Sequence, residues 1–245
     1  PIEDLLDAWA GLGYYSRVRN LQHACQQVAL DYDGEVPNDP IRFGALKGVG
    51  KYTCGAVMSI AFGRPEPIVD GNVERVFSRL FLIEENIRSN NAKKKFWSLA
   101  SDFVEDLPDH QSAGDLNQAL MELGALVCKP KQPNCQVCPL SQECRAKSEG
   151  KTQLLPIKSK APPKRTMRWR ARVVPDSQNR IWVVRRPSTG VLAGLWSLPM
   201  TEIKPDSDFQ LSATPTAEVK HAFTHLLWKL DVVHESEPQP LPEPE

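Results

Sequence analysis

The sequence predicts a two-domain protein of the α + α/β kind, with an all-helical first part and a smaller, strand-rich second part. Two observations lead to this fold class. Up to about residue 127, apolar residues recur at helical spacing and no alternating run of any length occurs. Beyond residue 166, short runs rich in β-branched and aromatic residues are separated by Pro, Gly, Asn and Ser. At 245 residues the chain is long enough for two cores.

Each helix of the first part is expected from its apolar periodicity and from residues that start or stop helices. The first begins at Pro1 and ends before Gly11, and Ser16 can cap the second, which runs to Gly34. The other helices are expected over residues 39–48, 52–62, 72–82, 92–105 and 115–127.

The second part is expected to begin after a connection that is rich in Pro and Lys and has no periodicity. The predicted order is a helical domain, a basic linker, a strand-rich domain and a disordered tail, at residues 1–146, 147–166, 167–236 and 237–245. Strands are expected over residues 169–174, 181–185, 195–198 and 221–233.

Charge is unevenly distributed although the formal net charge is zero. Ten basic residues and one acid lie between residues 145 and 172, whereas nine acids and three lysines follow residue 200. Such a basic segment fits a polyanionic partner, and it fits a solvated linker equally well. No apolar run has the length of a membrane span, and no secretion signal is recognised, so we predict neither.

Four of the six cysteines lie close together in the sequence, with the spacing C-x6-C-x2-C-x5-C. They are Cys128, Cys135, Cys138 and Cys144. Clustering of this kind indicates a metal centre rather than disulfides. Thiolate softness alone does not distinguish a zinc ion from a [4Fe–4S] cluster. Zinc sites usually place their ligands in two close pairs, and here only one pair is close, which favours the cluster.

A glycine pair and an aspartate form the second pattern. Gly48 and Gly50 stand between two predicted helices, where a hairpin can bring backbone N–H groups close to a phosphate. Neither a P-loop nor a dinucleotide fingerprint fits, because Tyr52 and Thr53 replace required residues. Asp70 follows at the mouth of another helix, where a helix N-cap is the simpler interpretation. A tight helix–helix turn is the corresponding simple interpretation of the glycines.

Together, the hairpin, the aspartate and the cysteines resemble the helix–hairpin–helix glycosylase superfamily over residues 1–144. The resemblance implies that Asp70 stabilises the oxocarbenium ion left when a base departs. It also implies that Asn72 helps to order the site. Tyr52 stands where the glycosylase–lyases of the endonuclease III type carry a Schiff-base lysine. Lys51 is one residue too early for that role. The resemblance therefore implies a monofunctional glycosylase, with Tyr52 shaping the site.

Residues 11–20 resemble the MutY branch of this superfamily. Tandem tyrosines after a glycine turn, followed by two arginines, suit stacking and phosphate contacts, although a helix entry with core tyrosines is also possible. The resemblance implies that Tyr14 wedges beside the damaged guanine. The DNA contacts expected in the helical domain are Tyr14, Arg17, Arg19, Gly48, Gly50 and Lys51.

Residues 185–199 resemble a Nudix-type domain, as appended in this family. A hydrolytic Nudix site needs a run of glutamates to hold Mg²⁺, and Glu202 and Glu218 are isolated. We therefore expect a recognition domain rather than a pyrophosphatase. Phe223, Thr224 and His225 resemble the family's Phe-Ser-His loop, which implies that they read 8-oxoguanine opposite the target adenine.

The resemblance as a whole implies a MutY-type adenine DNA glycosylase that acts in base excision repair. Such an enzyme binds double-stranded DNA, flips out adenine opposite 8-oxoguanine or guanine, and hydrolyses its N-glycosidic bond. A [4Fe–4S] cluster, a monomer and a bacterial cytoplasmic, nucleoid-associated location are expected. The family's general-acid Glu precedes the position of Pro1, so we expect a fragment or a truncated protein. A glycosylase–lyase and a non-catalytic DNA-damage-binding protein remain alternatives.

Overall fold

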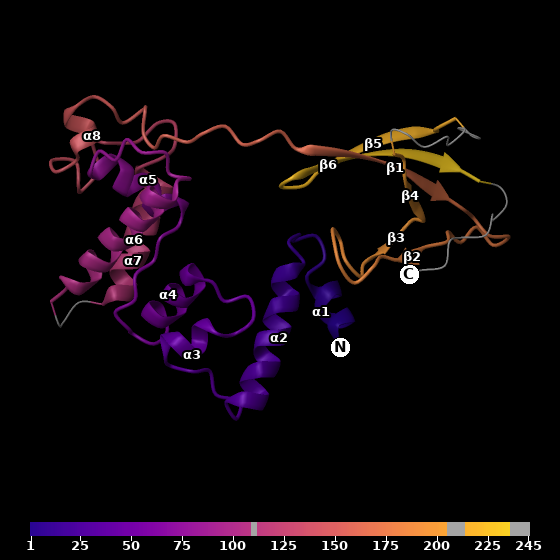
Figure 1. Cartoon of the computed structure of the whole chain (residues 1–245), viewed down its shortest axis with the longest axis horizontal. Coiled ribbons are helices and arrows are strands. Elements are labelled where there is room, and N and C mark those ends of the chain that lie inside the picture. Colours follow the sequence, from indigo (N-terminus) through magenta and orange to yellow (C-terminus); the bar gives the residue numbers. More distant parts are fainter. Residues whose placement is uncertain (109–111, 205–213, 236–245) are drawn as a thin grey trace. The chain divides into compact units, whose positions relative to one another are not determined.

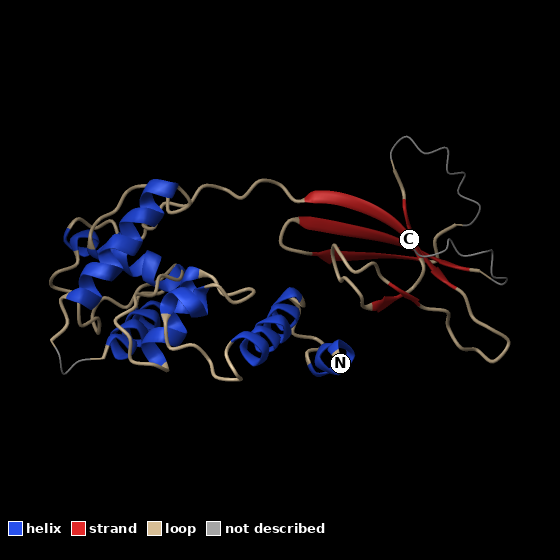
Figure 2. Cartoon of the chain, turned by 60° about the horizontal axis from the view of Figure 1, so that its bottom comes forward, coloured by secondary structure: helices blue, strands red, loops and turns tan. Residues whose placement is uncertain are grey.

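The computed structural model describes residues 1–108, 112–204 and 214–235, and it divides into two compact units after Lys160 (Figure 1). Described helices occur in the first unit and described strands in the second (Figure 2). The expected fold class, helical and then strand-rich, is confirmed. The predicted tail at 237–245 lies outside the described residues. None of the described helices is long and apolar enough to cross a membrane.

The helical unit consists of short and medium helices joined by turns. In chain order these are α1 (Ile2–Ala8), α2 (Ser16–Asp31), α3 (Pro40–Gly44), α4 (Lys51–Ile60), α5 (Gly71–Leu80), α6 (Asn90–Glu105), α7 (Ala113–Glu122), the π-helical turn η1 (Leu123–Val127) and α8 (Arg145–Ser148).

Each expected helix is present, but several ends differ from the prediction. Ser16 is the first residue of α2 rather than its cap, because the chain enters through Tyr15 in helical conformation. The helix expected over 39–48 stops at Gly44, and residues 45–50 turn into the hairpin. The helix expected to run to residue 127 widens into a π-helical turn after Glu122. Helix α8 was not predicted.

Two apolar clusters hold the helical unit together. One joins α5, α6 and α7 around Phe77, Phe96 and Leu120. The other joins α2, α3 and α4 around Phe43 and Met58. Because each buried Phe or Met side chain contributes roughly 1.5–3 kcal/mol, these clusters rather than helix propensity fix the packing.

The strand-rich unit contains a four-stranded mixed sheet and a separate two-stranded pair. The strands are β1 (Arg165–Val173), β2 (Val184–Arg185), β3 (Trp196–Ser197), β4 (Met200–Glu202), β5 (Ala217–Ala222) and β6 (Leu226–His234). The sheet order is β4-β1-β6-β5, and β2 pairs with β3. Strand β1 runs parallel to β6, whereas β4 and β5 run antiparallel to their neighbours.

The run expected as one strand over 221–233 is a hairpin in the structure. Its two arms are β5 and β6, and Phe223, Thr224 and His225 form the turn between them. Strand β4 was not predicted, and the strand expected over 181–185 is regular only at Val184–Arg185.

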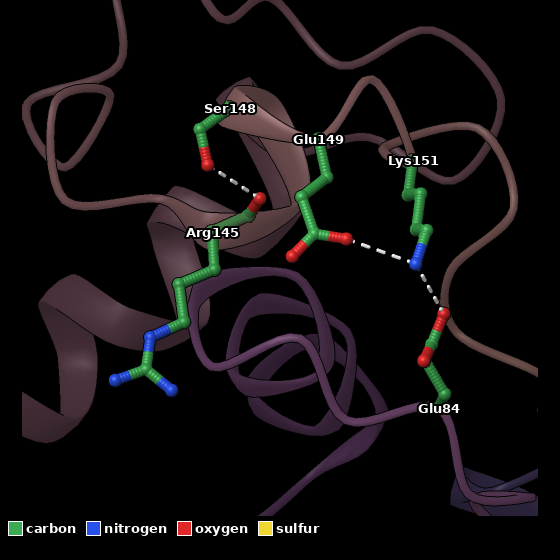
Figure 3. A network of polar contacts seen from close by, with 5 residues as sticks. All are labelled: Glu84, Arg145, Ser148, Glu149 and Lys151. Carbon is green, nitrogen blue, oxygen red and sulfur yellow. Dashed lines mark hydrogen bonds and ion pairs between the residues drawn. The ribbon is translucent and has the colours of Figure 1, made fainter.

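The segment after Cys144 is fixed to the helical unit by polar contacts. The Lys151 ammonium lies 2.9 Å from a carboxylate oxygen of Glu84 and 2.9 Å from one of Glu149, while the Arg145 side chain points away from this chain of contacts (Figure 3). Leu155 is buried, and its carbonyl oxygen accepts a 2.9 Å bond from Nε of Arg79. The unit boundary therefore falls inside the segment predicted as a linker.

Candidate functional site

Asp70 occupies the N-cap position of α5, and its carboxylate is held by three N–H donors. One carboxylate oxygen accepts bonds from the backbone N–H groups of Asn72 and Val73, at 2.9 and 2.8 Å. The other accepts a 2.9 Å bond from Nδ2 of Asn72. The extended backbone at Asp70 aims the carboxylate back over the first helical turn. This geometry fits both interpretations of Asp70, as a helix N-cap and as a stabiliser of positive charge. A carboxylate that caps a helix still has lone pairs that can face a further partner.

A buried arginine, Arg75, holds the side chain of Asn72 in place. Nη2 of Arg75 donates to Oδ1 of Asn72 at 2.8 Å and to the carbonyl oxygen of Gly124 at 2.6 Å. Nε of Arg75 donates to the carbonyl oxygen of Cys128 at 2.7 Å. Burial lowers the pKa of the Arg75 guanidinium. Asp70, Asn72 and the first cysteine of the loop thus belong to one hydrogen-bonded network.

Sequence reasoning did not find Arg75 or Gly124. Arg75 stands three residues after Asn72 on a helix, and residues at this spacing lie side by side. This spacing is the only feature of the sequence that could have indicated their contact. Gly124 gives no signal in the sequence. A Cβ atom added there would lie 2.6 Å from Cβ of Asn72, so the π-helical turn approaches α5 too closely for a side chain.

The glycine hairpin leads into α4 without a side-chain cap. Gly48 has φ +80°, and a Cβ atom added to it would lie 2.5 Å from Cβ of Asn20, so only glycine fits. Gly50 is the N-cap of α4, where no side chain accepts from the first-turn N–H groups. Tyr52 is exposed, and its hydroxyl lies 3.7 Å from Sδ of Met121. Nζ of Lys51 lies 4.0 Å from the centre of the Trp97 ring.

Tyr14 projects into solvent from a strained turn. Its φ is +48°, which is rare for a residue with a side chain, and the residue is 67% exposed. The Arg17 guanidinium carbon lies 5.2 Å from the centre of the Tyr14 ring. Arg17 and Arg19 are both on α2. An exposed aromatic ring held by a turn is the geometry that a wedge between bases requires.

The four clustered cysteines line a single cavity. Cys128, Cys135, Cys138 and Cys144 are free thiols, and all four contribute to the wall of this cavity. Burial raises the pKa of the Cys138 thiol, and the other three cysteines raise it further, so the four sulfurs are electrostatic neighbours. Among the described residues, no group of three or more His, Cys, Asp or Glu has the geometry that holds a metal ion.

Arg79 forms the floor beneath this cysteine loop. Arg79 is 1% exposed, and its Nη1 lies 3.2 Å from Sγ of Cys128. The guanidinium also donates to the carbonyl oxygens of Lys129 and Pro130, at 2.8 and 2.9 Å. Sequence reasoning missed Arg79, because its partners lie about fifty residues away in the chain.

The predicted recognition residues lie at the β5–β6 turn. Phe223 N–H donates to the carbonyl oxygen of Leu226 at 2.8 Å, which closes the turn, and Thr224 and His225 are exposed. The Phe223 ring packs edge-on against Trp228 at 4.9 Å. Nζ of Lys164 donates to the carbonyl oxygen of Phe223 at 2.5 Å. A hydroxyl and an imidazole are therefore presented together beside a packed aromatic ring.

Glu202 and Glu218 do not converge in the strand-rich unit. They lie on β4 and β5, which are the two edge strands of the four-stranded sheet. Glu218 forms a 3.0 Å ion pair with Lys220 on its own strand. The two glutamates therefore supply no paired carboxylates for a divalent cation.

Comparison with known families matches both units. The family described as "HhH-GPD superfamily base excision DNA repair protein" matches residues 1–102. The family described as "NUDIX domain" matches residues 170–244. The two matched regions fall on the two units of the structure.

Several curated relatives are adenine DNA glycosylases. The chain is 35% identical to that of Schizosaccharomyces pombe, over 83% of this chain and 52% of the relative. It is 33% identical to that of Homo sapiens, over 95% of this chain and 51% of the relative. The chain therefore spans about half the length of these relatives.

Solved structures resemble the chain as well. A thermostable thymine-DNA glycosylase matches with a TM-score of 0.53 and 32% identity, over 61% of this chain and 67% of that chain. Endonuclease III in a non-covalent DNA complex matches with a TM-score of 0.50 and 30% identity, over the same shares of the two chains.

Proposed function

The chain belongs to the HhH-GPD superfamily of base excision DNA repair proteins, and from this membership we propose that it is a monofunctional adenine glycosylase. Its substrate is adenine paired with 8-oxoguanine or guanine in double-stranded DNA. The observation that carries the proposal is the Asp70 carboxylate at the mouth of α5, which is held by Asn72, whose side chain is held in turn by Arg75. The adenine DNA glycosylase relatives support the choice of base.

Asp70 stabilises the positive charge that develops on the sugar. When the bond between C1′ and the base nitrogen breaks, the electron pair leaves with adenine and C1′ becomes an oxocarbenium ion. An ionised carboxylate that is already oriented stabilises this ion without further reorganisation. Asn72 orients the carboxylate through its side-chain N–H, and Arg75 prevents Asn72 from turning away. Water then adds to C1′ and loses a proton to the solvent, which leaves a hydroxyl group on the sugar.

The departing adenine needs a proton, and the resemblance assigns its delivery to a glutamate at a position before Pro1. Tyr52 determines whether the DNA strand is cut after the base has been released. A phenol cannot form a Schiff base with the sugar, so the DNA strand stays intact after base release. Endonuclease III-type glycosylase–lyases would instead need an amine at this position.

Contacts with the DNA come from the glycine hairpin, and from the turn at Tyr14 with the start of α2. The N–H groups at the uncapped start of α4, with Lys51 beside them, suit a phosphate. Tyr14 inserts beside the lesion, and Arg17 and Arg19 contact flanking phosphates. The target adenine leaves the base stack to reach Asp70. The protein acts as a monomer where chromosomal DNA is found, which in a bacterium is the nucleoid in the cytoplasm.

The four cysteines hold a [4Fe–4S] cluster. Four free thiols around one cavity fit the donor set of such a cluster, and Arg79 beneath them offsets the negative charge of thiolates. When bound, the cluster cross-links the loop from Cys128 to Cys144. Anaerobically purified protein should be brown and contain iron. A colourless protein with one zinc per chain would contradict this assignment.

The turn formed by Phe223, Thr224 and His225 reads the base opposite adenine. 8-Oxoguanine differs from guanine by a carbonyl at C8 and a proton on N7. The hydroxyl of Thr224 and the imidazole of His225 can meet such a polar target or its flanking phosphate. The strand-rich unit thereby acts in recognition rather than in pyrophosphate hydrolysis.

Single-turnover release of adenine tests the proposal. The 245-residue chain, and the same chain extended at Pro1 by a helix that carries a glutamate, are each incubated with duplexes containing adenine opposite 8-oxoguanine or thymine. The extended chain should release adenine only opposite 8-oxoguanine, and both chains should bind that duplex in preference to the one with thymine. Binding without release by the extended chain would instead identify a non-catalytic damage-binding protein.

A further inference from the structure

A groove of about 540 Å³ lies beside the hairpin, between the start of α4 and one side of α6. Lys51 forms one wall, and Lys93, Lys94 and Trp97 form the other. The remaining lining residues are uncharged hydrogen-bonding residues, namely Asn90, Ser98 and Ser101. The described lining therefore contains three cations and no acid.

The helix dipole does not account for the lysines of α6. Lys93 lies at the end of the first turn, where the dipole favours acids, Lys94 and Lys95 follow in the next turn, and the first turn contains no acid. Lys95 forms a 3.0 Å ion pair with Glu85. Within the described ranges no ion pair is found for Lys93 or Lys94, although Glu74 is an electrostatic neighbour of Lys93. An ion pair within the fold thus accounts for the charge of Lys95, whereas the charges of Lys93 and Lys94 have no such explanation among the described residues.

Trp97 connects the groove with the hairpin. The Lys51 ammonium lies 4.0 Å above the Trp97 ring, a distance at which the ring face attracts a cation. Lys51 follows directly after Gly50, the N-cap of α4. The ring therefore holds Lys51 between the hairpin N–H groups and the lysines of α6, so that the three ammonium groups border one continuous groove.

We propose that this groove binds phosphates of the DNA backbone and extends the DNA contact of the hairpin onto α6. Lys93 and Lys94 bind the phosphates, and Trp97 positions Lys51 between the two sets of contacts. Ammonium groups with serine and asparagine side chains match phosphate oxygens, and none of them specifies a base sequence. The proposal rests on the glycosylase function, because it supposes that DNA lies across the hairpin.

The salt dependence of duplex binding tests the groove. For a bound duplex, the slope of log K against log salt concentration changes by about 0.9 for each phosphate contact that is lost. The Lys93→Ala/Lys94→Ala double variant should therefore reduce the slope by about 1.8 with both lesion-containing and undamaged duplexes. Alanine is a good helix former at these exposed positions, so α6 should persist. Lys95→Ala is the matched control and should leave the slope nearly unchanged.

The outcomes separate this proposal from the proposed function. If the double variant keeps the slope of the unaltered protein, the groove proposal is overturned and the glycosylase proposal is unaffected. If Lys95→Ala reduces the slope as much as the double variant, the contact is a diffuse charge effect and the groove proposal is also overturned. If the unaltered protein binds no duplex, both proposals fall.

Discussion

Asp70 and the turn at Phe223 are both polar sites, and the chain holds them in different ways. The Asp70 carboxylate accepts three hydrogen bonds, and the residue that donates two of them is itself held by a buried guanidinium. Thr224 and His225 are exposed, in a turn closed by one backbone bond. The turn is supported by the Phe223–Trp228 contact, by Lys164, and by Arg165 N–H, which donates to the carbonyl oxygen of His225. The Asp70 side chain is thus fixed by hydrogen bonds, whereas the contacts of the turn hold its backbone and the Phe223 ring.

This difference follows from what each site has to do. A group that stabilises a transition state must be in place before the charge appears, because a displacement of about 1 Å can cost as much as 10²-fold in rate. A recognition turn needs only a small difference in free energy between two bound bases. The predictions below test whether perturbation of the two sites differs accordingly.

Asp70→Asn should have the largest effect. Asparagine is as good an N-cap as aspartate, so α5 should stay intact while the negative charge is lost. Adenine release by the glutamate-extended chain should fall by roughly 10²–10³-fold, as for other preorganised charge stabilisers. Asp39→Asn is the matched control, since Asp39 caps α3 through a 2.8 Å bond from Arg42 N–H. Near-normal turnover of the Asp70 variant would remove Asp70 from the mechanism.

Arg79→Leu should cost about 3 kcal/mol or more in the free energy of unfolding. The change leaves the buried carbonyl oxygen of Leu155 without a donor, at roughly 1–3 kcal/mol, and removes the donor of the partly buried carbonyl oxygens of Lys129 and Pro130, at a smaller cost each. Arg79→Lys should recover only part of the loss, because an ammonium lacks the planar fork of donors. Urea unfolding measures both variants. A loss within 0.5 kcal/mol, of the order of an ordinary surface substitution, would show that Arg79 does not fix the loop.

Replacing Phe223, Thr224 and His225 together by Ala should reduce the preference for 8-oxoguanine over guanine opposite adenine. Each contact to a base is worth about 1–3 kcal/mol. The salt dependence of binding should change little, because that slope reports phosphate contacts. Competition binding with the two duplexes gives both quantities. Full lesion preference in the triple variant would reduce this turn to a structural hairpin.

Gly124→Ala should have the smallest effect, roughly a tenfold loss of adenine release. The new methyl group would lie 2.6 Å from Cβ of Asn72 and displace it from Asp70. Gly44→Ala is the control, because its methyl group would meet only Sγ of Cys54, at an ordinary 3.8 Å. Equal rates for the two variants would show that the position of Asn72 does not matter.

The sequence predicted those parts of the site that depend on local spacing. The N-cap position of Asp70, the hairpin glycines and the grouping of the cysteines all follow from neighbours along the chain. Arg79 and Gly124 escaped prediction because their partners lie about fifty residues away. Arg75 is only three residues from Asn72, but its bonds to Cys128 and Gly124, which bury it, are equally distant in the chain. Strand β4 and the parallel pairing of β1 with β6 escaped for the same reason, since distant segments decide strand pairing.

One reaction tests the central claim, which is that Asp70 promotes the release of adenine and that Tyr52, which has no amine, leaves the DNA strand uncut. The glutamate-extended chain is incubated with a duplex containing adenine opposite 8-oxoguanine, in the presence of borohydride, and base release, strand cleavage and covalent protein–DNA adduct are measured together. The account predicts released adenine, an intact strand and no adduct, because Tyr52 offers no amine. A borohydride-trapped adduct, or strand cleavage in step with base release, would contradict it.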